Sequence, residues 1–326
     1  MSGASKVSIR PVPSATRARI IAETHGLADK PLWRAQAVAS SVGGQLSGDF
    51  AASDVAITAE DVKQGTLYFA RGDTDAQAAR ANGAAGIVTT TSLAGPHILV
   101  DETGEALSLL ARASRNRARG TIMAILGFSG DTVADVLGRA LKLASRGTSW
   151  TADTGQGLDL ALSRLAADRS HALFGIDGVT APEPLRPHLV ILGPDAGREA
   201  GRRVAASVEA GGAAILPADH PDFARWRAAA MDAGAAVTAY GLRASADIRL
   251  LDQVDGPFGG TLVSVEIHGR PLCYTIADGA DAGATMAVIG AMRAAGASLG
   301  AAAMTLADDA FASRTCEKIT SGVGAD

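Results

Sequence analysis

Residues 120–147 read GTIMAILGFSGDTVADVLGRALKLASRG. The first eight residues are mostly apolar, which is typical of a β-strand. A glycine-rich turn follows, and from Asp131 onward apolar residues recur at the spacing of an amphipathic helix. A strand that leads through a glycine turn into a helix is how a nucleotide-binding α/β domain begins.

The sequence after this unit continues to alternate between strands and helices. Two segments, GREAGRRVAASVEAG and FARWRAAAMDAG, have the pattern of helices between short apolar strands. Such alternation predicts a largely parallel sheet covered by helices. Residues 261–277 then predict a hairpin with its turn at His268, Gly269 and Arg270, and residues 284–311 predict two packed, alanine-rich helices. The expected strands are SHALFGID, PHLVILG, GAAILPAD, AAVTAYG and ADIRLLD.

The sequence before it predicts a smaller α/β unit. PLWRAQAVASSVGGQL is a short helix stopped by Gly43 and Gly44, and VAIT, TLYFA and AGIVTT are short strands. Residues 1–31 show no clear periodicity, which predicts a flexible N-terminal segment. We therefore expect an α/β protein with a small domain over 32–117, a central domain over 118–315 and a tail over 316–326.

Composition excludes several classes of partner. Charged residues make up 20% of the chain and the net charge is −4, so no basic field is available for nucleic acid or an anionic membrane. No apolar run reaches the roughly 18 residues that a membrane span needs. The sequence predicts a cytoplasmic protein. Its two cysteines, Cys273 and Cys316, lack the spacing of a zinc or redox site.

The order of several segments resembles the Mur ligase family, in particular the branch that adds D-alanyl-D-alanine to UDP-N-acetylmuramoyl-tripeptide. The segments GGQLSGDF, KQGTLYFA, ANGAAGIV and ILVDETGEALSLLARASRNR resemble the N-terminal domain, and EAGGAAILPADHPDFARW resembles the central ATPase domain. The resemblance implies a P-loop-like central domain that uses ATP and magnesium. The family's third domain would begin near Arg314, so the resemblance also implies that this domain is absent.

The phosphate loop departs from the family pattern. That pattern, G-x-x-G-K-T-T, cradles the phosphates with backbone N–H groups and neutralises them with lysine. The matching segment, residues 127–133, has an aspartate in place of the lysine, at Asp131. Two unit charges about 4 Å apart interact by roughly 4 kcal/mol at an effective dielectric constant of 20, so the reversed sign should repel ATP. The vestigial loop residues are Gly127, Ser129, Gly130, Asp131 and Thr132. Alternatively, Asp131 only complements the positive end of its own helix.

Other positions that the resemblance makes functional are also changed. Ile176 takes the place of a magnesium-binding glutamate, with Asp177 as a possible substitute or a turn residue. The carbamylated lysine falls near Gly201, and the stretch 193–199 lacks the family's histidine. Pro217 replaces the adenine-contacting asparagine, although Asp219 remains. The segments 279–285 and 58–61 also lose their matching polar residues. We therefore expect no catalytic residue, no metal ligand and no ATP or magnesium cofactor.

These losses leave three hypotheses. The first is a non-catalytic subunit or scaffold partner of another enzyme, with a protein partner or an oligomer; the alanine-rich helices could be its docking face, unless they simply pack on the sheet. The second is a module that senses a nucleotide or UDP-muramoyl peptide, with Arg198, Arg202 and Arg203 as anion contacts in the cleft, unless these arginines lie on an exposed helix face. The third is a Mur-type ATP-dependent amide ligase completed in trans.

Overall fold

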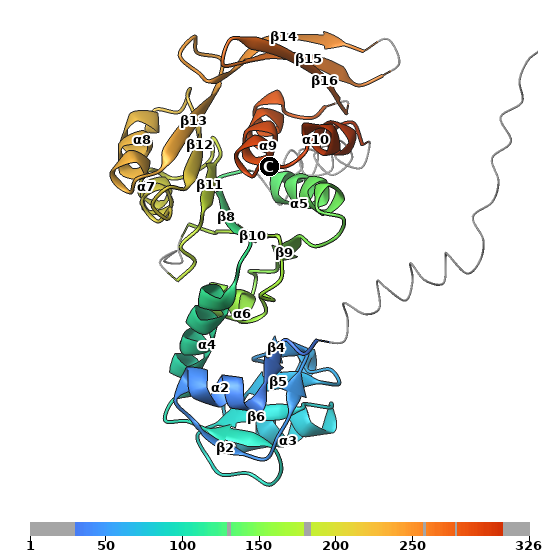
Figure 1. The fold of residues 1–326 in the computed structure, drawn as a ribbon, viewed down its shortest axis with the longest axis vertical. Coiled ribbons are helices and arrows are strands. Elements are labelled where there is room, and N and C mark those ends of the chain that lie inside the picture. The colour runs from blue at the N-terminus through green and yellow to red at the C-terminus, as the bar shows by residue number, and fades with distance from the viewer. Residues whose placement is uncertain (1–29, 129–131, 179–183, 257–258, 278, 309–326) are drawn as a thin grey trace, which may run out of the picture. The chain divides into compact units, whose positions relative to one another are not determined.

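A computed structural model describes residues 30–128, 132–178, 184–256, 259–277 and 279–308 (Figure 1). Contacts divide the chain into two compact units between residues 101 and 102. The sequence predictions for residues 1–29 and for the tail from 316 lie outside the described residues. Among the described helices, none combines the length and the apolar composition of a membrane span.

The first unit is built on a five-stranded sheet in the order β2-β7-β6-β5-β4. β2 is antiparallel to β7, and the remaining neighbours are parallel. The neighbouring strands β5 and β6, both inside the sheet, are buried along their whole length. Two-residue strands β1 and β3 form a separate antiparallel pair. The strands are β1 (Trp33–Arg34), β2 (Gln45–Ser47), β3 (Ala51–Ala52), β4 (Asp54–Ala56), β5 (Thr66–Phe69), β6 (Gly86–Thr89) and β7 (His97–Leu99).

The helices of this unit are α2 (Ala35–Val42), α3 (Asp73–Ala81) and the short 3₁₀ helix η1 (Ala59–Asp61). α2 ends at Gly43, whose φ of 67° lies in the left-handed region. A glycine reaches that region without steric cost, so it is the usual residue after a helix end. The predicted stop at Gly43 is confirmed.

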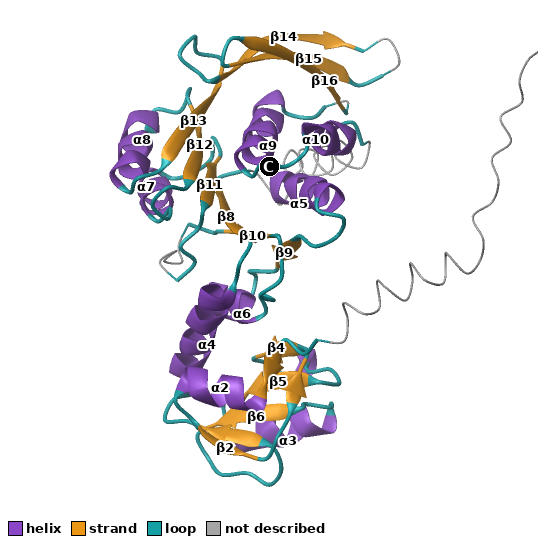
Figure 2. Ribbon diagram, in the orientation of Figure 1, coloured by secondary structure: helices purple, strands orange, loops and turns teal. Residues whose placement is uncertain are grey.

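The second unit is built on a nine-stranded sheet in the order β16-β15-β14-β13-β12-β11-β8-β10-β9 (Figure 2). Strands β8 to β14 pair in parallel, and β15 and β16 add an antiparallel hairpin. The strands are β8 (Thr121–Leu126), β9 (Trp150–Ala152), β10 (His171–Gly175), β11 (Leu189–Leu192), β12 (Ala213–Pro217), β13 (Ala236–Gly241), β14 (Ile248–Asp255), β15 (Thr261–Ile267) and β16 (Arg270–Ile276). The predicted α/β class with a mostly parallel sheet is confirmed.

Helices cover both faces of this sheet, as the alternating sequence requires. On one face α5, α9 and α10 form a core with Met123 and Ile125 of β8. On the other, α4, α6, α7 and α8 pack around Ile122, Ala124 and Leu126. Successive residues of β8 therefore enter opposite cores, as the two-residue period of a strand dictates. The helices are α4 (Thr103–Arg117), α5 (Thr132–Ala144), α6 (Leu158–Ser163), α7 (Arg198–Ala206), α8 (Phe223–Asp232), α9 (Ala282–Ala294) and α10 (Leu299–Leu306).

Helix α4 belongs to the second unit, although the sequence placed it at the end of the first domain. Its Ser108 hydroxyl donates to the carboxylate of Asp159 on α6, and its Ser114 hydroxyl donates to the carbonyl of Leu165 at 2.9 Å. Ala111 of α4 joins the core of the second sheet. The amphipathic pattern predicted a helix here, but not the sheet against which it packs.

The alanine-rich helices pack on the sheet. Every residue of α9 from Ala282 to Met292 except Gly283 is buried. Small side chains let α9 approach the strands and α5 closely. On α10, Met304 is exposed, whereas Ala301, Ala302, Thr305 and Leu306 are buried. This packing supports the structural interpretation of these helices over their use as a docking face.

Candidate functional site

The carboxyl ends of the parallel strands lie along one edge of the large sheet, where ligands bind in open α/β folds. The turns that follow β8, β10, β11 and β12 contain Gly127, Asp177, Asp195 and Asp219. These are the positions that the sequence analysis compared with a phosphate loop and its surroundings. Ser129, Gly130 and Asp131 lie outside the described residues, and α5 begins at Thr132.

The turn after β8 is pressed against the turn after β11. The amide of Asp195 donates to the carbonyl of Gly127 at 2.9 Å, and the amide of Gly193 donates to that of Leu126 at 2.8 Å. A Cβ atom on Gly127 would lie 2.2 Å from the amide nitrogen of Ala196, and one on Gly193 would lie 2.0 Å from the carbonyl oxygen of Gly127. Both positions therefore require glycine. The carbonyl of Gly127 thus already accepts a hydrogen bond from within the protein.

The charges of carboxylates from three elements act on the buried phenol of Tyr240. Its hydroxyl donates to the carbonyl of Leu192 at 2.9 Å. Burial raises the pKa of Tyr240 well above its ordinary value, and the charges of Asp281, Asp195 and Asp219 raise it further. The three carboxylates thus act on one point at this edge of the sheet.

Two of these carboxylates have evident structural roles. Asp281 caps the N-terminus of α9 by accepting from the amides of Gly283 at 2.9 Å and Ala284 at 3.2 Å. Asp219 accepts from the amide of Leu242 at 2.7 Å and pairs with Arg243 at 3.6 Å. Within the described parts of the chain, no three His, Cys, Asp or Glu side chains gather in a way that could hold a metal ion.

The position compared with the magnesium-binding glutamate carries an apolar side chain. Ile176 is 9% exposed and joins the second core, and its amide donates to the carbonyl of Ile125 at 2.8 Å. Gly178 follows in the left-handed region, with φ 79°. Asp177 stands between these two residues in a turn.

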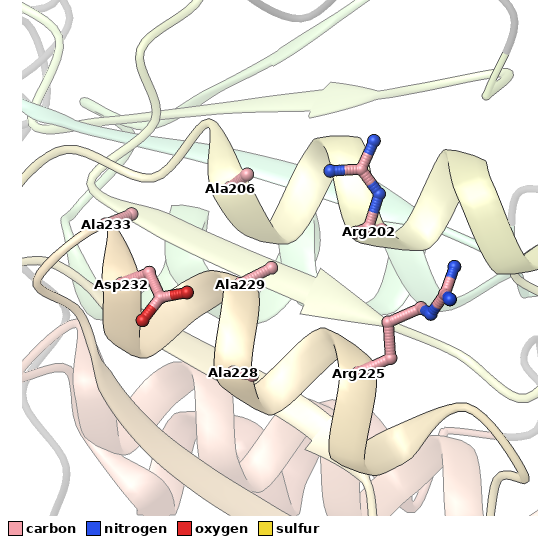
Figure 3. A pocket seen from close by; sticks show the side chains of 7 residues that line it. All are labelled: Arg202, Ala206, Arg225, Ala228, Ala229, Asp232 and Ala233. Atoms are coloured by element: carbon pink, nitrogen blue, oxygen red, sulfur yellow. The ribbon is translucent and has the colours of Figure 1, made fainter.

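Helix α7 brings the three predicted anion contacts together, but each is engaged within the protein. Arg198 pairs with Asp222 at 2.9 Å, Arg202 pairs with Glu199 at 2.9 Å, and Arg203 donates to the carbonyl of Gly178 at 2.6 Å. Arg202 faces the neighbouring helix α8, where it lines a groove (Figure 3).

Gly201 of α7 lies directly against Trp226 of α8. A Cβ atom on Gly201 would stand 2.5 Å from Cε2 of the indole and 2.8 Å from its Nε1. The indole is fully buried, and its N–H donates to the carbonyl of Arg198 at 2.9 Å. It stacks on His220 with ring centroids 4.1 Å apart. The carbamylated lysine of the family was expected near Gly201, and at Gly201 itself the indole fills the space that a longer side chain would need.

Sequence reasoning did not find the pair formed by His220 and Trp226. The only available signal was the segment HPDFARW, which places an imidazole six residues before an indole at the start of a helix. It also missed Arg115, a buried side chain of α4. Arg115 pairs with Glu209 at 2.9 Å, and His188 lies 3.2 Å from the same carboxylate oxygen.

In the first unit, the residues compared with the UDP-contacting segment form an exposed turn. Glu60 and Asp61 belong to η1, and the hydroxyl of Thr58 donates to Asp61 at 2.5 Å. The side-chain amide of Asn82 holds this turn by donating to the carbonyl of Ala59 at 2.8 Å. The turn therefore presents two carboxylates rather than a cation.

The arrangement of strands and helices is shared with solved ligases. UDP-N-acetylmuramoylalanyl-D-glutamyl-2,6-diaminopimelate--D-alanyl-D-alanyl ligase from Acinetobacter baumannii superposes with a TM-score of 0.70, covering 86% of this chain and 69% of that one at 17% identity. MurF ligase from Thermotoga maritima, solved with ADP, gives a TM-score of 0.60 over 77% of this chain and 65% of that one at 16% identity. The fold is that of the Mur ligases.

A further ligase of this fold is UDP-N-acetylmuramoyl-L-alanyl-D-glutamate--2,6-diaminopimelate ligase, with a TM-score of 0.51, 16% identity, and coverage of 79% of this chain and 62% of that one. No family model and no curated protein matches the sequence. At such low identity the likeness to Mur ligases concerns the fold, whereas function depends on the residues at the site.

Proposed function

We propose that this chain is a Mur-ligase-like protein without ligase activity, which acts in the cytosol as a non-catalytic subunit or scaffold partner of another enzyme. The observation that carries the proposal is the packing of Gly201 against the buried indole of Trp226. A side chain long enough to form a carbamate cannot occupy position 201 unless that indole moves. The second magnesium of the family reaction would then lack a ligand, and the acyl phosphate would form without its counter-charge.

The charges at the sheet edge also support the proposal. Asp195, Asp219 and Asp281 raise the pKa of Tyr240 from three separate elements. The sequence adds a fourth carboxylate, Asp131, at the family's lysine position. A triphosphate placed there in the family pose would face repulsion instead of neutralisation, because fixed charges act strongly where water is scarce.

The preserved interior supports a role for the folded protein itself. Both faces of the large sheet are filled by continuous apolar cores, and the close turns keep their glycines. The apolar cores stabilise the fold and take no part in phosphate chemistry. A chain that maintains them while the site residues differ is suited to binding another protein.

The proposal is tested by calorimetry and by co-purification. Titrations with ATP, ADP, UDP and a UDP-muramoyl tripeptide, with and without magnesium, should all give flat traces. Affinity purification from the native cytosol should return a stoichiometric enzyme partner. Phosphate release from ATP with muramoyl precursors would favour a ligase completed in trans, and saturable binding without turnover would favour a sensing module. Either result would contradict the proposal.

A further inference from the structure

A groove with a volume of about 620 Å³ runs between α7 and α8. Four alanines form most of its lining, with two arginines at one end and an aspartate at the other (Figure 3). The lining residues are Arg202, Ala206, Arg225, Ala228, Ala229, Asp232 and Ala233.

The basic end of the groove has a net charge of +1, from Arg202, Arg225 and the carboxylate of Glu199 that binds both. Glu199 accepts from Arg202 at 2.9 Å through one carboxylate oxygen and from Arg225 at 2.6 Å through the other. All three side chains are between 45% and 56% exposed. The shared carboxylate orients both guanidinium groups, so they lose less conformational freedom when they bind a further anion.

The acidic end is formed by Asp232, an exposed residue with no ion pair or side-chain hydrogen bond in the described part of the chain. It lies seven residues after Arg225, which is two turns along the same face of α8. The groove therefore has opposite charges about two turns apart.

The positions of these charges are unfavourable for α8 taken alone. The helix has no acidic residue in its first turn and no basic residue in its last, and Arg225 and Asp232 occupy those two ends. The macrodipole favours the reverse arrangement. The pair with Glu199 of α7 accounts for Arg225, whereas nothing within α8 accounts for the exposed Asp232 at its C-terminal end.

We propose that the face formed by α7 and α8 binds a second copy of this chain through a twofold symmetric contact. A surface with a positive and a negative end is complementary to itself when the second copy is turned by 180°. Each cluster of Arg202, Arg225 and Glu199 then meets the partner's Asp232. The alanines let the two α8 helices approach closely, with their dipoles antiparallel.

The proposal does not depend on the proposed function, because the contact forms whether or not a nucleotide binds. Two helices per subunit give a contact near the lower size limit for specific interfaces, roughly 1,000 Å². We therefore expect reversible association that increases with protein concentration.

Variants with reversed charges test the twofold contact directly. Their association is measured by sedimentation velocity over a wide range of protein concentration. The wild type should form dimers. Asp232→Arg or Arg225→Asp should weaken dimerisation by roughly tenfold or more, since symmetry places two repulsive contacts in each dimer. The double variant with both Asp232→Arg and Arg225→Asp has opposite charges at the two ends again and should restore the dimer. Asp252→Arg, at an exposed position of β14, changes the net charge as much as Asp232→Arg does and should have no effect.

Circular dichroism of each variant separates dissociation from unfolding, and Asp232→Arg places a cation where the dipole of α8 favours one. A wild type that stays monomeric at every concentration would overturn the proposal. Single reversals that leave the dimer intact, or a folded double variant that stays monomeric, would also overturn it.

Discussion

A Cβ atom on Gly201 of α7 would stand 2.5 Å from Cε2 of Trp226 on α8. The two helices meet at this glycine because no side chain separates them there. Gly201 therefore has a packing role, and the same contact leaves no room at position 201 for the lysine that the resemblance to Mur ligases places near this residue. Under the proposed function, packing stability and the absence of the ligase reaction are linked at this one residue.

Replacing Gly201 with alanine should destabilise the protein by about 1–3 kcal/mol, because a methyl group must displace a fully buried indole. Urea denaturation measures the difference. Gly197→Ala is a suitable control, since a Cβ atom at Gly197 meets nothing within 4 Å. A Gly201→Ala variant as stable as the control would contradict the packing argument.

Replacing Trp226 with alanine should cost about 3–5 kcal/mol, since the indole lies wholly inside the second core. The loss also removes the stack on His220 and the hydrogen bond to Arg198. Thermal unfolding followed by circular dichroism would show it. If Trp226→Ala relieves the cost of Gly201→Ala in the double variant, the two residues are directly coupled; additive effects would argue against contact.

The network around Arg115 should contribute to the stability of the second unit. Arg115 donates to the carbonyl of Leu185 at 2.6 Å and to the carboxylate of Glu209 at 2.9 Å. Glu209→Gln removes the charge and keeps an acceptor, so we expect a loss of about 1–2 kcal/mol in chemical denaturation, reduced by the partial exposure of Glu209. No measurable change would mean that water replaces the carboxylate.

Folding stability should fall as the pH drops below about 6.5. Burial, and then the charge of Arg115, lowers the pKa of His188 below its ordinary value. Burial likewise lowers the pKa of His171. Between the two pKa values the unfolded chain binds protons that the folded chain does not bind. The contribution of the two imidazoles to folding stability is therefore complete above the unfolded pKa and is lost as the pH falls toward the folded pKa.

Urea unfolding between about pH 7.5 and 5.5 measures the slope of the free energy of unfolding against pH. His188→Gln can still accept from the amide of Ile122, which donates to Nδ1 at 2.9 Å, and should reduce the slope. The double variant with His171→Gln should reduce it further. A slope unchanged by both substitutions would contradict the assignment to these imidazoles.

Local patterns predicted most of the fold. The strand and the helix within 120–147 and the hairpin over 261–277 were correctly predicted, because apolar periodicity is a local property. The hairpin turns at His268 and Gly269, both with positive φ. The domain assignment of α4 was not predictable, because its apolar stripe packs against a sheet whose strands come later in the chain.

The candidate site was less predictable. The absence of the family's side chains could be read directly from the residue types. The contact between Gly201 and Trp226 joins two helices separated by a strand, so it depends on how α7 and α8 cross. The field around Tyr240 likewise needs three elements in place. Such relationships exist only after the chain has folded.

The central claim is that this Mur-ligase fold does not bind a nucleoside triphosphate in the family pose. Isothermal titration of the full chain with ATP and magnesium tests it most directly. We predict no saturable heat at any ATP concentration accessible to the method. Saturable binding that is abolished by a bulkier residue at Gly130, which lies between β8 and α5 in the sequence, would contradict the account.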